Sequence, residues 1–321
     1  MPSTLAQPED DLQTVQCMEV WGGNSGAETS VRMRGLDAWV LSRPWKNEQA
    51  GGDVHYLSSC ATGRIARVLI ADVAGHGQMV AASAQRLRDL MRKYVNYLDQ
   101  RKVARELNRQ FVQESDGGTF ATAVLATFWT PTDEVDLSIA GHPPPFVYRA
   151  DAGRWEMISD DETRSSVGLP LGIEDGSAYS RRRLRLGPSD LLFVYTDGLL
   201  EAGVEKGQML GPSGVLELLN RLGGDAPQSL LANLTDAVQE RFGELPNDDV
   251  TLLLLRPNAA KPRASFVGGV HAGLRIVREV GRSVFGKAGP SPLPEVTVRN
   301  FAGAFVAKPN KTRSGGKAGR P

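Results

Sequence analysis

The chain has 321 residues, of which 41% are hydrophobic, enough to fill a sizeable core in one large domain or two small ones. Its 37 basic and 37 acidic side chains cancel, so no field of the whole protein attracts nucleic acid, an anionic membrane or an acidic substrate. Cys17 and Cys60 are too few for a disulfide framework, and neither a signal peptide nor a membrane span is expected. We therefore expect a globular cytoplasmic protein.

The N-terminal half is predicted to begin with a loose arm. Residues 1–15 are polar and acidic and show no periodicity. The structured domain then begins near Gln16, and short β-type runs predict strands over 36–41, 54–60, 64–71 and 120–129. Between the last two strands, apolar residues recur at steps of three and four, which predicts helices over 79–98 and 102–114.

A second β-rich block follows, with turns supplied by Gly and Pro. Its predicted strands are 135–140, 145–149, 154–158, 179–186, 191–196 and 250–255, and its predicted helices are 211–222 and 226–242. Most links between strands are too short for crossover helices, which favours antiparallel sheets. We expect two such sheets packed face to face, with helices covering their outer faces.

The composition changes after Arg256-Pro257, where Gly, Pro, Ala and Lys become frequent. Residues 259–321 contain twelve Lys and Arg against two Glu, a net charge of +10. We therefore predict one domain over 16–258, followed by a basic, largely disordered tail in which residues 270–286 could form one amphipathic helix.

Several predicted strands have an aspartate at one end: Asp53, Asp72, Asp197, Asp248 and Asp249. Taken singly, each is explained as a turn or cap residue. Taken together they predict a metal site, because converging carboxylates repel one another unless cations lie between them. A ligand set of oxygens selects Mg²⁺ or Mn²⁺. Two such ions could activate a water and orient it for in-line attack on a phosphoryl group.

Six segments support this interpretation by their order and spacing: ADVAGHG, GTFATAVLATF, SIAGHPPP, SSVGLPLGI, DLLFVYTDGLLEA and NDDVTLLLLR. In this ordered set the chain resembles the metal-dependent serine/threonine protein phosphatases of the PPM family, in the SpoIIE/RsbU-like bacterial branch. The resemblance spans roughly residues 50–256. It implies an α+β fold, a four-layer α-β-β-α sandwich with a two-metal centre at one end of the sheets.

The resemblance also implies the metal ligands. Asp72 would bridge the two ions, and Val73 would lend its backbone carbonyl. Asp53 would bind the second ion, and Asp197 and Asp248 would hold the first.

The positions around these ligands are less specific. For Asp249 two roles stay open: a metal ligand, or a residue behind the ligands that orients water. Gly198 and Thr119 are further candidates for such outer positions. The segment from Val54 to Tyr56 departs from the family's usual sequence, which puts the surroundings of the second ion in doubt.

His76 follows Asp72 by four residues and has two interpretations. As a general acid it would protonate the leaving serine or threonine oxygen, and as a structural residue it would shape the loop. His142, in AGHPPP, is interpreted as loop-stabilising. A zinc hydrolase built on His55, His76 and His142 is a rival class, but their spacing forms no helix-borne histidine pair.

The leading interpretation is a phosphoserine/phosphothreonine protein phosphatase with two Mn²⁺ or Mg²⁺ ions and with Asp72 and His76 as catalytic residues. Cys60 lacks the glycine loop that a cysteine nucleophile needs, so no phosphoenzyme is expected. The resemblance implies a small phosphorylated regulator as substrate, such as an anti-sigma-factor antagonist. Residues 16–50 are too short for a sensor domain, so control is expected from a separate regulatory protein, from the helix at 79–98 or from metal occupancy. The alternative is a catalytically weak, phosphatase-like binding module. For the tail, contacts with an anionic membrane, with nucleic acid and with the catalytic domain all stay open.

Overall fold

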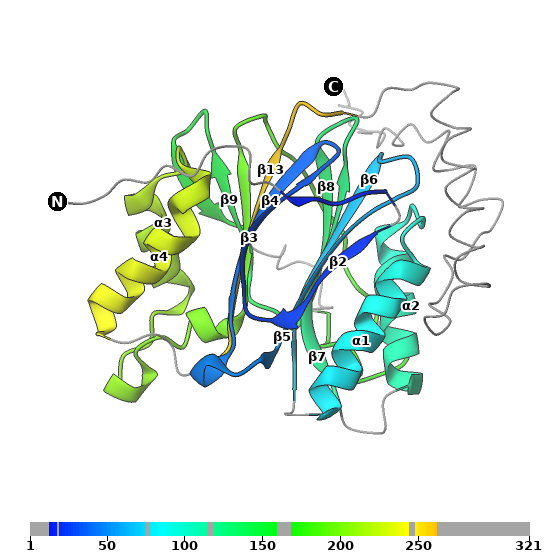
Figure 1. The fold of residues 1–321 in the computed structure, drawn as a ribbon, viewed down its shortest axis with the longest axis horizontal. Coiled ribbons are helices and arrows are strands. Elements are labelled where there is room, and N and C mark those ends of the chain that lie inside the picture. Colours follow the sequence, from blue (N-terminus) through cyan, green and yellow to red (C-terminus); the bar gives the residue numbers. More distant parts are fainter. Residues whose placement is uncertain are drawn as a thin grey trace, which may run out of the picture.

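The computed structural model describes residues 13–17, 19–74, 78–114, 119–158, 168–243 and 248–261. His76 and the candidate helix at 270–286 lie outside these residues. Two sheets lie face to face in the middle of the molecule, with α1 and α2 beside one sheet and α3 and α4 beside the other (Figure 1). Among the helices of the described ranges, none combines the length and apolar character that a membrane crossing requires.

The strands form one sheet of seven and one of six. The seven-stranded sheet has the order β1 (Gln13–Thr14), β3 (Ala27–Met33), β4 (Leu36–Arg43), β13 (Val250–Pro257), β12 (Leu191–Tyr195), β9 (Phe146–Arg149) and β10 (Arg154–Met157). The six-stranded sheet has the order β11 (Arg182–Arg185), β8 (Glu134–Ala140), β7 (Ala121–Trp129), β6 (Ile65–Val73), β5 (Ala50–Ser59) and β2 (Val20–Ser25). Only the pair β1 and β3 is parallel among these strands.

The helices cover the outer faces of the sheets, as expected. They are α1 (Gln78–Lys93), α2 (Gln100–Glu114), α3 (Gly211–Leu222) and α4 (Pro227–Phe242), and short 3-10 turns occur at η2 (Trp45–Asn47), η3 (Asp197–Leu199) and η4 (Val204–Lys206). The fold is therefore an α+β sandwich with the layer order α-β-β-α, which confirms the predicted fold class.

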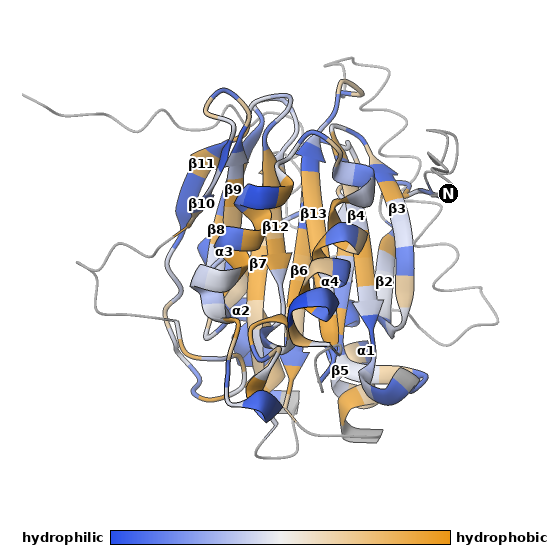
Figure 2. Cartoon of the chain, turned by 90° about the vertical axis from the view of Figure 1, so that its left-hand side faces the viewer, coloured by the Kyte–Doolittle hydropathy of each residue, from blue (hydrophilic) through white to orange (hydrophobic). Residues whose placement is uncertain are grey.

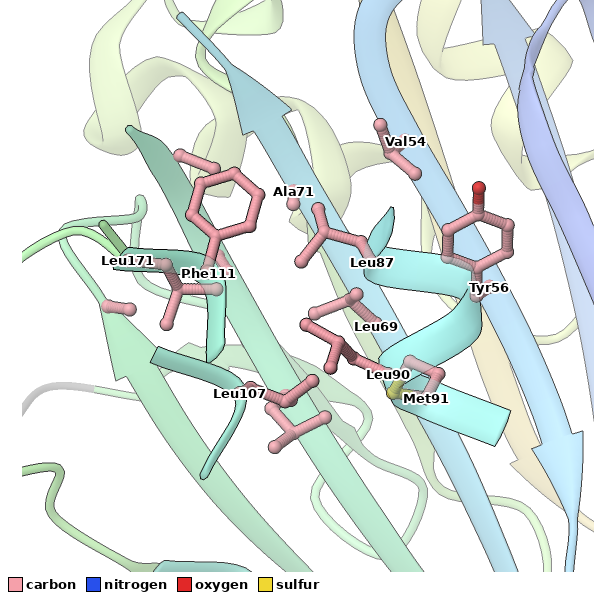
Figure 3. Packing of buried hydrophobic residues seen from close by; sticks show 14 of the residues in the cluster. Val54, Tyr56, Leu69, Ala71, Leu87, Leu90, Met91, Leu107, Phe111 and Leu171 are labelled. Carbon is pink, nitrogen blue, oxygen red and sulfur yellow. The ribbon is translucent and has the colours of Figure 1, made fainter. Parts of the chain in front are cut away.

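The central strands bury both of their faces, so their sequences are almost entirely apolar. In β13, Leu252 and Leu254 pack with α3 and α4, whereas Leu253 and Leu255 face the other sheet. Leu69 and Ala71 of β6 lie beneath side chains of α1 and α2 in the same way (Figure 3). Figure 2 shows the contrast between these hydrophobic central strands and the largely hydrophilic edge strand β11.

The first helix ends earlier than the predicted range 79–98. It stops at Lys93, and a turn follows over residues 94–96. The guanidinium of the buried Arg67, on β6, donates hydrogen bonds to the carbonyls of Val95 and Tyr97. Because these tertiary bonds replace helical ones, the chain leaves the helix although its apolar periodicity continues to Leu98.

Two edges of the domain also differ from the predictions. Gln13 and Thr14 pair with β3 and Val15 is buried, so these three residues are not part of a loose arm. The strand predicted over 179–186 is limited to β11, because the carbonyl of Ser180 accepts a hydrogen bond from a side chain of β8 and not from the sheet ladder.

Candidate active site

Asp53 and Asp72 lie inside β5 and β6, directly opposite each other in the antiparallel ladder. The strand expected from residue 54 begins at Ala50, so Asp53 is not a residue that precedes a strand. Directly paired residues project from the same face of a sheet. Their neighbours Val54 and Val73 pack under the helices, so both carboxylates face the other sheet.

The seven-stranded sheet brings the remaining aspartates to the same end. Asp197 begins η3 two residues after the last residue of β12, and Asp248 and Asp249 immediately precede β13. Because β12 and β13 are antiparallel neighbours, the end of one lies beside the start of the other. The five aspartates therefore lie within or beside four strands that belong to two different sheets.

The carboxylates interact electrostatically. Burial, followed by repulsion from Asp197 and Asp248, raises the pKa of Asp72 to about 7. Burial also raises the pKa of Asp53 well above its ordinary value; hydrogen bonds from Thr196 and Thr251 oppose this rise, and the charge of Asp72 adds to it. Ionisation of all these neighbouring carboxyl groups is energetically unfavourable without cations, because the charges repel one another. Cations bound beside the carboxylates would remove this repulsion.

Asp249 differs from the other aspartates because both of its carboxylate oxygens are already engaged. Oδ1 accepts a hydrogen bond from the backbone N–H of Trp45 at 2.6 Å, and Oδ2 accepts one from the N–H of Gly52. Asp249 thereby ties Trp45 of the β4–β5 connection and Gly52 of β5 to the start of β13.

Two glycines allow the segments to approach closely. An ideal Cβ on Gly52 would lie 3.1 Å from the carbonyl oxygen of Val73 and 3.2 Å from Oδ1 of Asp72, so glycine leaves open a space that these two oxygens border. An ideal Cβ on Gly198 would lie 2.1 Å from the carbonyl oxygen of Asp249, so only glycine allows η3 to pack there. Gly198 is thus explained by packing.

The donor set fits a hard divalent cation. Carboxylates and the Val73 carbonyl offer only oxygen, which suits Mg²⁺ or Mn²⁺ and not Zn²⁺. Within the described ranges, no group of three or more His, Cys, Asp and Glu side chains is arranged so that it could hold a metal ion. Mg²⁺ accepts such an incomplete protein shell because it retains several waters.

Two other predicted residues have different surroundings. Thr119 precedes β7 and is half-buried, and its carbonyl lies against Gly172. His142 joins the two sheets: its Nε2 donates to the carbonyl of Tyr195 at 2.9 Å, and its Nδ1 accepts from Oγ1 of Thr122 at 2.8 Å. Burial lowers the pKa of His142 to about 4, so the ring is neutral and structural.

Sequence reasoning missed three residues of this region. Glu201 contributes to the raised pKa of Asp72, and its position four residues after Asp197 was the available signal. Thr196 donates a hydrogen bond to Asp53, and Thr251 donates its backbone N–H to Thr196. Nothing in the local sequence indicates these contacts, because Thr196 and Asp53 are 143 residues apart.

The fold is shared with solved phosphatase domains. The RsbU and RsbW domains of Rv1364c from Mycobacterium tuberculosis align with a TM-score of 0.60 and 24% identity, covering 80% of this chain and 72% of that one. The PP2C phosphatase domain of SpoIIE from Bacillus subtilis, solved with a fragment of its regulatory domain, aligns with a TM-score of 0.58 and 16% identity, covering 74% and 71%. The architecture is thus that of a PP2C-type phosphatase domain.

A family model described as Stage II sporulation protein E (SpoIIE) matches residues 62–258. This match covers more than half of the chain, and the chain belongs to the SpoIIE family. Phosphoserine phosphatase RsbU of Bacillus subtilis (strain 168) is 26% identical over 222 residues, which cover 69% of this chain and 63% of RsbU. The chain therefore spans less than two thirds of the length of that relative.

Proposed function

We propose that this chain is a metal-dependent phosphoserine/phosphothreonine protein phosphatase. The observation that carries the proposal is the meeting of acidic side chains from both sheets at one end of the sandwich, where burial and neighbouring charges raise the pKa of Asp72 to about 7. Membership of the SpoIIE family supports the same reaction class.

In this proposal Asp53, Asp72, Asp197, Asp248 and the carbonyl of Val73 hold two Mg²⁺ or Mn²⁺ ions. When bound, the ions would lower the pKa of a water and orient it for in-line attack on a phosphoryl group. Asp72, which pairs with Asp53 in one sheet and interacts electrostatically with Asp197 and Asp248 of the other, would be shared by both ions. Asp249 would hold the β4–β5 connection and the start of β5 in place through its two backbone hydrogen bonds.

The leaving oxygen of serine or threonine needs a proton, and we assign this step to His76. The substrate class follows from the relatives: one of them is named a phosphoserine phosphatase, and we propose a small phosphorylated regulatory protein of the anti-sigma-factor antagonist type. A catalytically weak binding module is the alternative, and it predicts phosphoprotein binding without phosphate release.

Substitution of Asp72 tests the metal mechanism. Asp72→Asn keeps the size of the side chain but removes the charge shared by both ions, so hydrolysis of p-nitrophenyl phosphate in Mn²⁺ should fall by at least about 100-fold. Chelation of divalent ions should abolish the wild-type rate, and re-addition should restore it. The rate is measured as release of nitrophenol, with circular dichroism as the check on folding.

Asp151→Asn is a matched control, because Asp151 is an exposed turn residue between β9 and β10. It should hydrolyse at the wild-type rate. Wild-type turnover by Asp72→Asn would contradict the metal mechanism. An inactive wild-type chain that still binds a phosphoprotein would favour the binding module.

A further inference from the structure

Thr196 lies between the two sheets and links Asp53 to the opposite sheet. Its side chain is fully buried, and its Oγ1 donates to Oδ2 of Asp53 at 2.6 Å. Asp53 belongs to β5 of the six-stranded sheet, whereas Thr196 follows β12 of the seven-stranded sheet. This hydrogen bond therefore connects the sheets at the acidic end.

The direction of this hydrogen bond is fixed by the partners of Thr196. The backbone N–H of Thr251 donates to Oγ1 of Thr196 at 2.9 Å, so Oγ1 is already an acceptor. The single hydroxyl proton can then go to Asp53 or to the carbonyl of Thr251, which is 3.5 Å away. The shorter bond to a carboxylate is much the stronger of the two.

The hydroxyl of Thr251 is a second neutral partner of Asp53, since its side-chain hydrogen bond also opposes the rise that burial causes in the pKa of that carboxyl, and a further hydroxyl lies beside it. Oγ1 of Thr251 lies 3.0 Å from Oγ of Ser42, and both residues are buried on neighbouring strands β13 and β4. In the described part of the chain no ion pair involves Asp53, although its exposed fraction is only 4%. The orientation of this carboxylate thus depends on neutral hydroxyl donors.

We propose that Thr196 is a positioning residue: its hydroxyl fixes the Asp53 carboxylate so that the remaining oxygen can bind the second metal ion. The inference rests on the proposed function, because it assumes that Asp53 is a ligand. Thr196 also directly precedes Asp197, so one short segment carries a ligand of one ion and orients a ligand of the other. Groups that hydrogen-bond to metal ligands typically account for 10- to 100-fold in metal affinity.

The test is metal binding by the full chain. Thr196→Val has nearly the same shape but no hydroxyl, and we expect its Mn²⁺ dissociation constant, measured by calorimetry on the metal-free protein, to rise about 10- to 100-fold. Thr196→Ser restores the hydroxyl and should restore the affinity. Thr130→Val is the matched control, since Thr130 is equally buried but donates to the carbonyl of Gly63 at the opposite end of β7, and it should bind Mn²⁺ as the wild type does.

A Thr196→Val protein that folds and binds Mn²⁺ like the wild type would overturn the inference while leaving the proposed function intact. So would equal losses in Thr196→Val and Thr196→Ser, because the hydroxyl would then not be the cause. If Thr196→Val does not fold, Thr196→Ala is measured, and failure of both variants to fold would assign the hydroxyl to stability and reject the positioning role. If the wild type itself binds no Mn²⁺, the proposed metal centre fails and the inference fails with it.

Discussion

Single buried polar side chains connect the two sheets near the aspartates. His142 is one of them, since it lies between Thr122 on β7 and the carbonyl of Tyr195 on β12. The carbonyl can only accept, so Nε2 carries the proton and Nδ1 accepts from the threonine hydroxyl. The neutral ring satisfies both partners, which explains why its burial is tolerated.

This geometry predicts that stability depends on pH through His142. The pKa of His142 is lowered from 6.5 to about 4 in the folded protein. Between pH 4 and pH 6.5 the His142 ring is therefore protonated in the unfolded chain but neutral in the folded protein. Its contribution to the free energy of unfolding is fully present above pH 6.5 and declines as the pH falls toward 4. Because of this histidine alone, the free energy of unfolding should fall by about 2 kcal/mol when the pH is lowered from 7 to 5.

The measurement is urea unfolding of the wild type and of His142→Gln at both pH values, with a chelator present to remove bound metal. The variant has no titrating ring, so its stability should fall by less between the two pH values. Parallel pH profiles for the two proteins would show that His142 does not contribute to the pH dependence.

At the scale of whole elements, a polar row crosses the six-stranded sheet beneath the α1–α2 connection. Strand register places the following residues side by side: Ser58, Arg67, Thr127, Asp136 and Arg183. Arg67 donates to Thr127 at 2.7 Å and to the connection through two backbone carbonyls, while Arg183 binds both carboxylate oxygens of Asp136. The row sets where α1 ends and where α2 can begin.

Arg67→Met should destabilise the fold by about 3 kcal/mol. The substitution retains much of the buried volume, but it leaves the carbonyls of Val95 and Tyr97 without their donor, and hydrogen bonds to charged groups contribute about 1.5–3 kcal/mol each. The free energy of unfolding is measured by denaturant titration. Arg182→Met, on the exposed edge strand β11, is the control and should change it by less than about 0.5 kcal/mol. Equal effects of the two substitutions would contradict the role assigned to Arg67.

At the scale of the whole molecule, three apolar layers are stacked through the sandwich. One lies between the sheets, and one lies beneath each pair of helices. The last strand, β13, is central in its sheet, and Asn258 after it donates to the carbonyl of Met33 and to Asp37. The described residues up to this point therefore supply both sheets and three apolar layers.

Removal of residues 262–321 should leave the melting temperature and the rate of aryl phosphate hydrolysis unchanged, because the described residues up to Lys261 already form both sheets and three apolar layers. The removed segment carries eleven Lys and Arg against two Glu, so its loss should weaken a salt-sensitive association with anionic vesicles. Vesicle sedimentation at low and high salt measures this association. A truncated chain that unfolds or loses hydrolysis would place the domain boundary later in the sequence.

The sequence by itself determined the elements whose signals are local. The helix predicted over 211–222 matches α3. The final strand was predicted correctly because a short run of leucines bounded by Asp249 and Pro257 is typical of a buried strand. The layer order also followed from short links and strands that are apolar on both faces. The aspartates were recognisable as a group because the ordered set of segments around them is characteristic.

Only the tertiary structure decided how distant residues meet. The pairing of Asp53 with Asp72 depends on strand register, and the end of α1 depends on a buried arginine from another strand. The hydrogen bond from Thr196 to Asp53 joins two sheets. Periodicity reports only which face of an element is apolar, whereas these contacts arise from the packing of one sheet on another, where a buried polar group must find its partner wherever the fold brings one within reach.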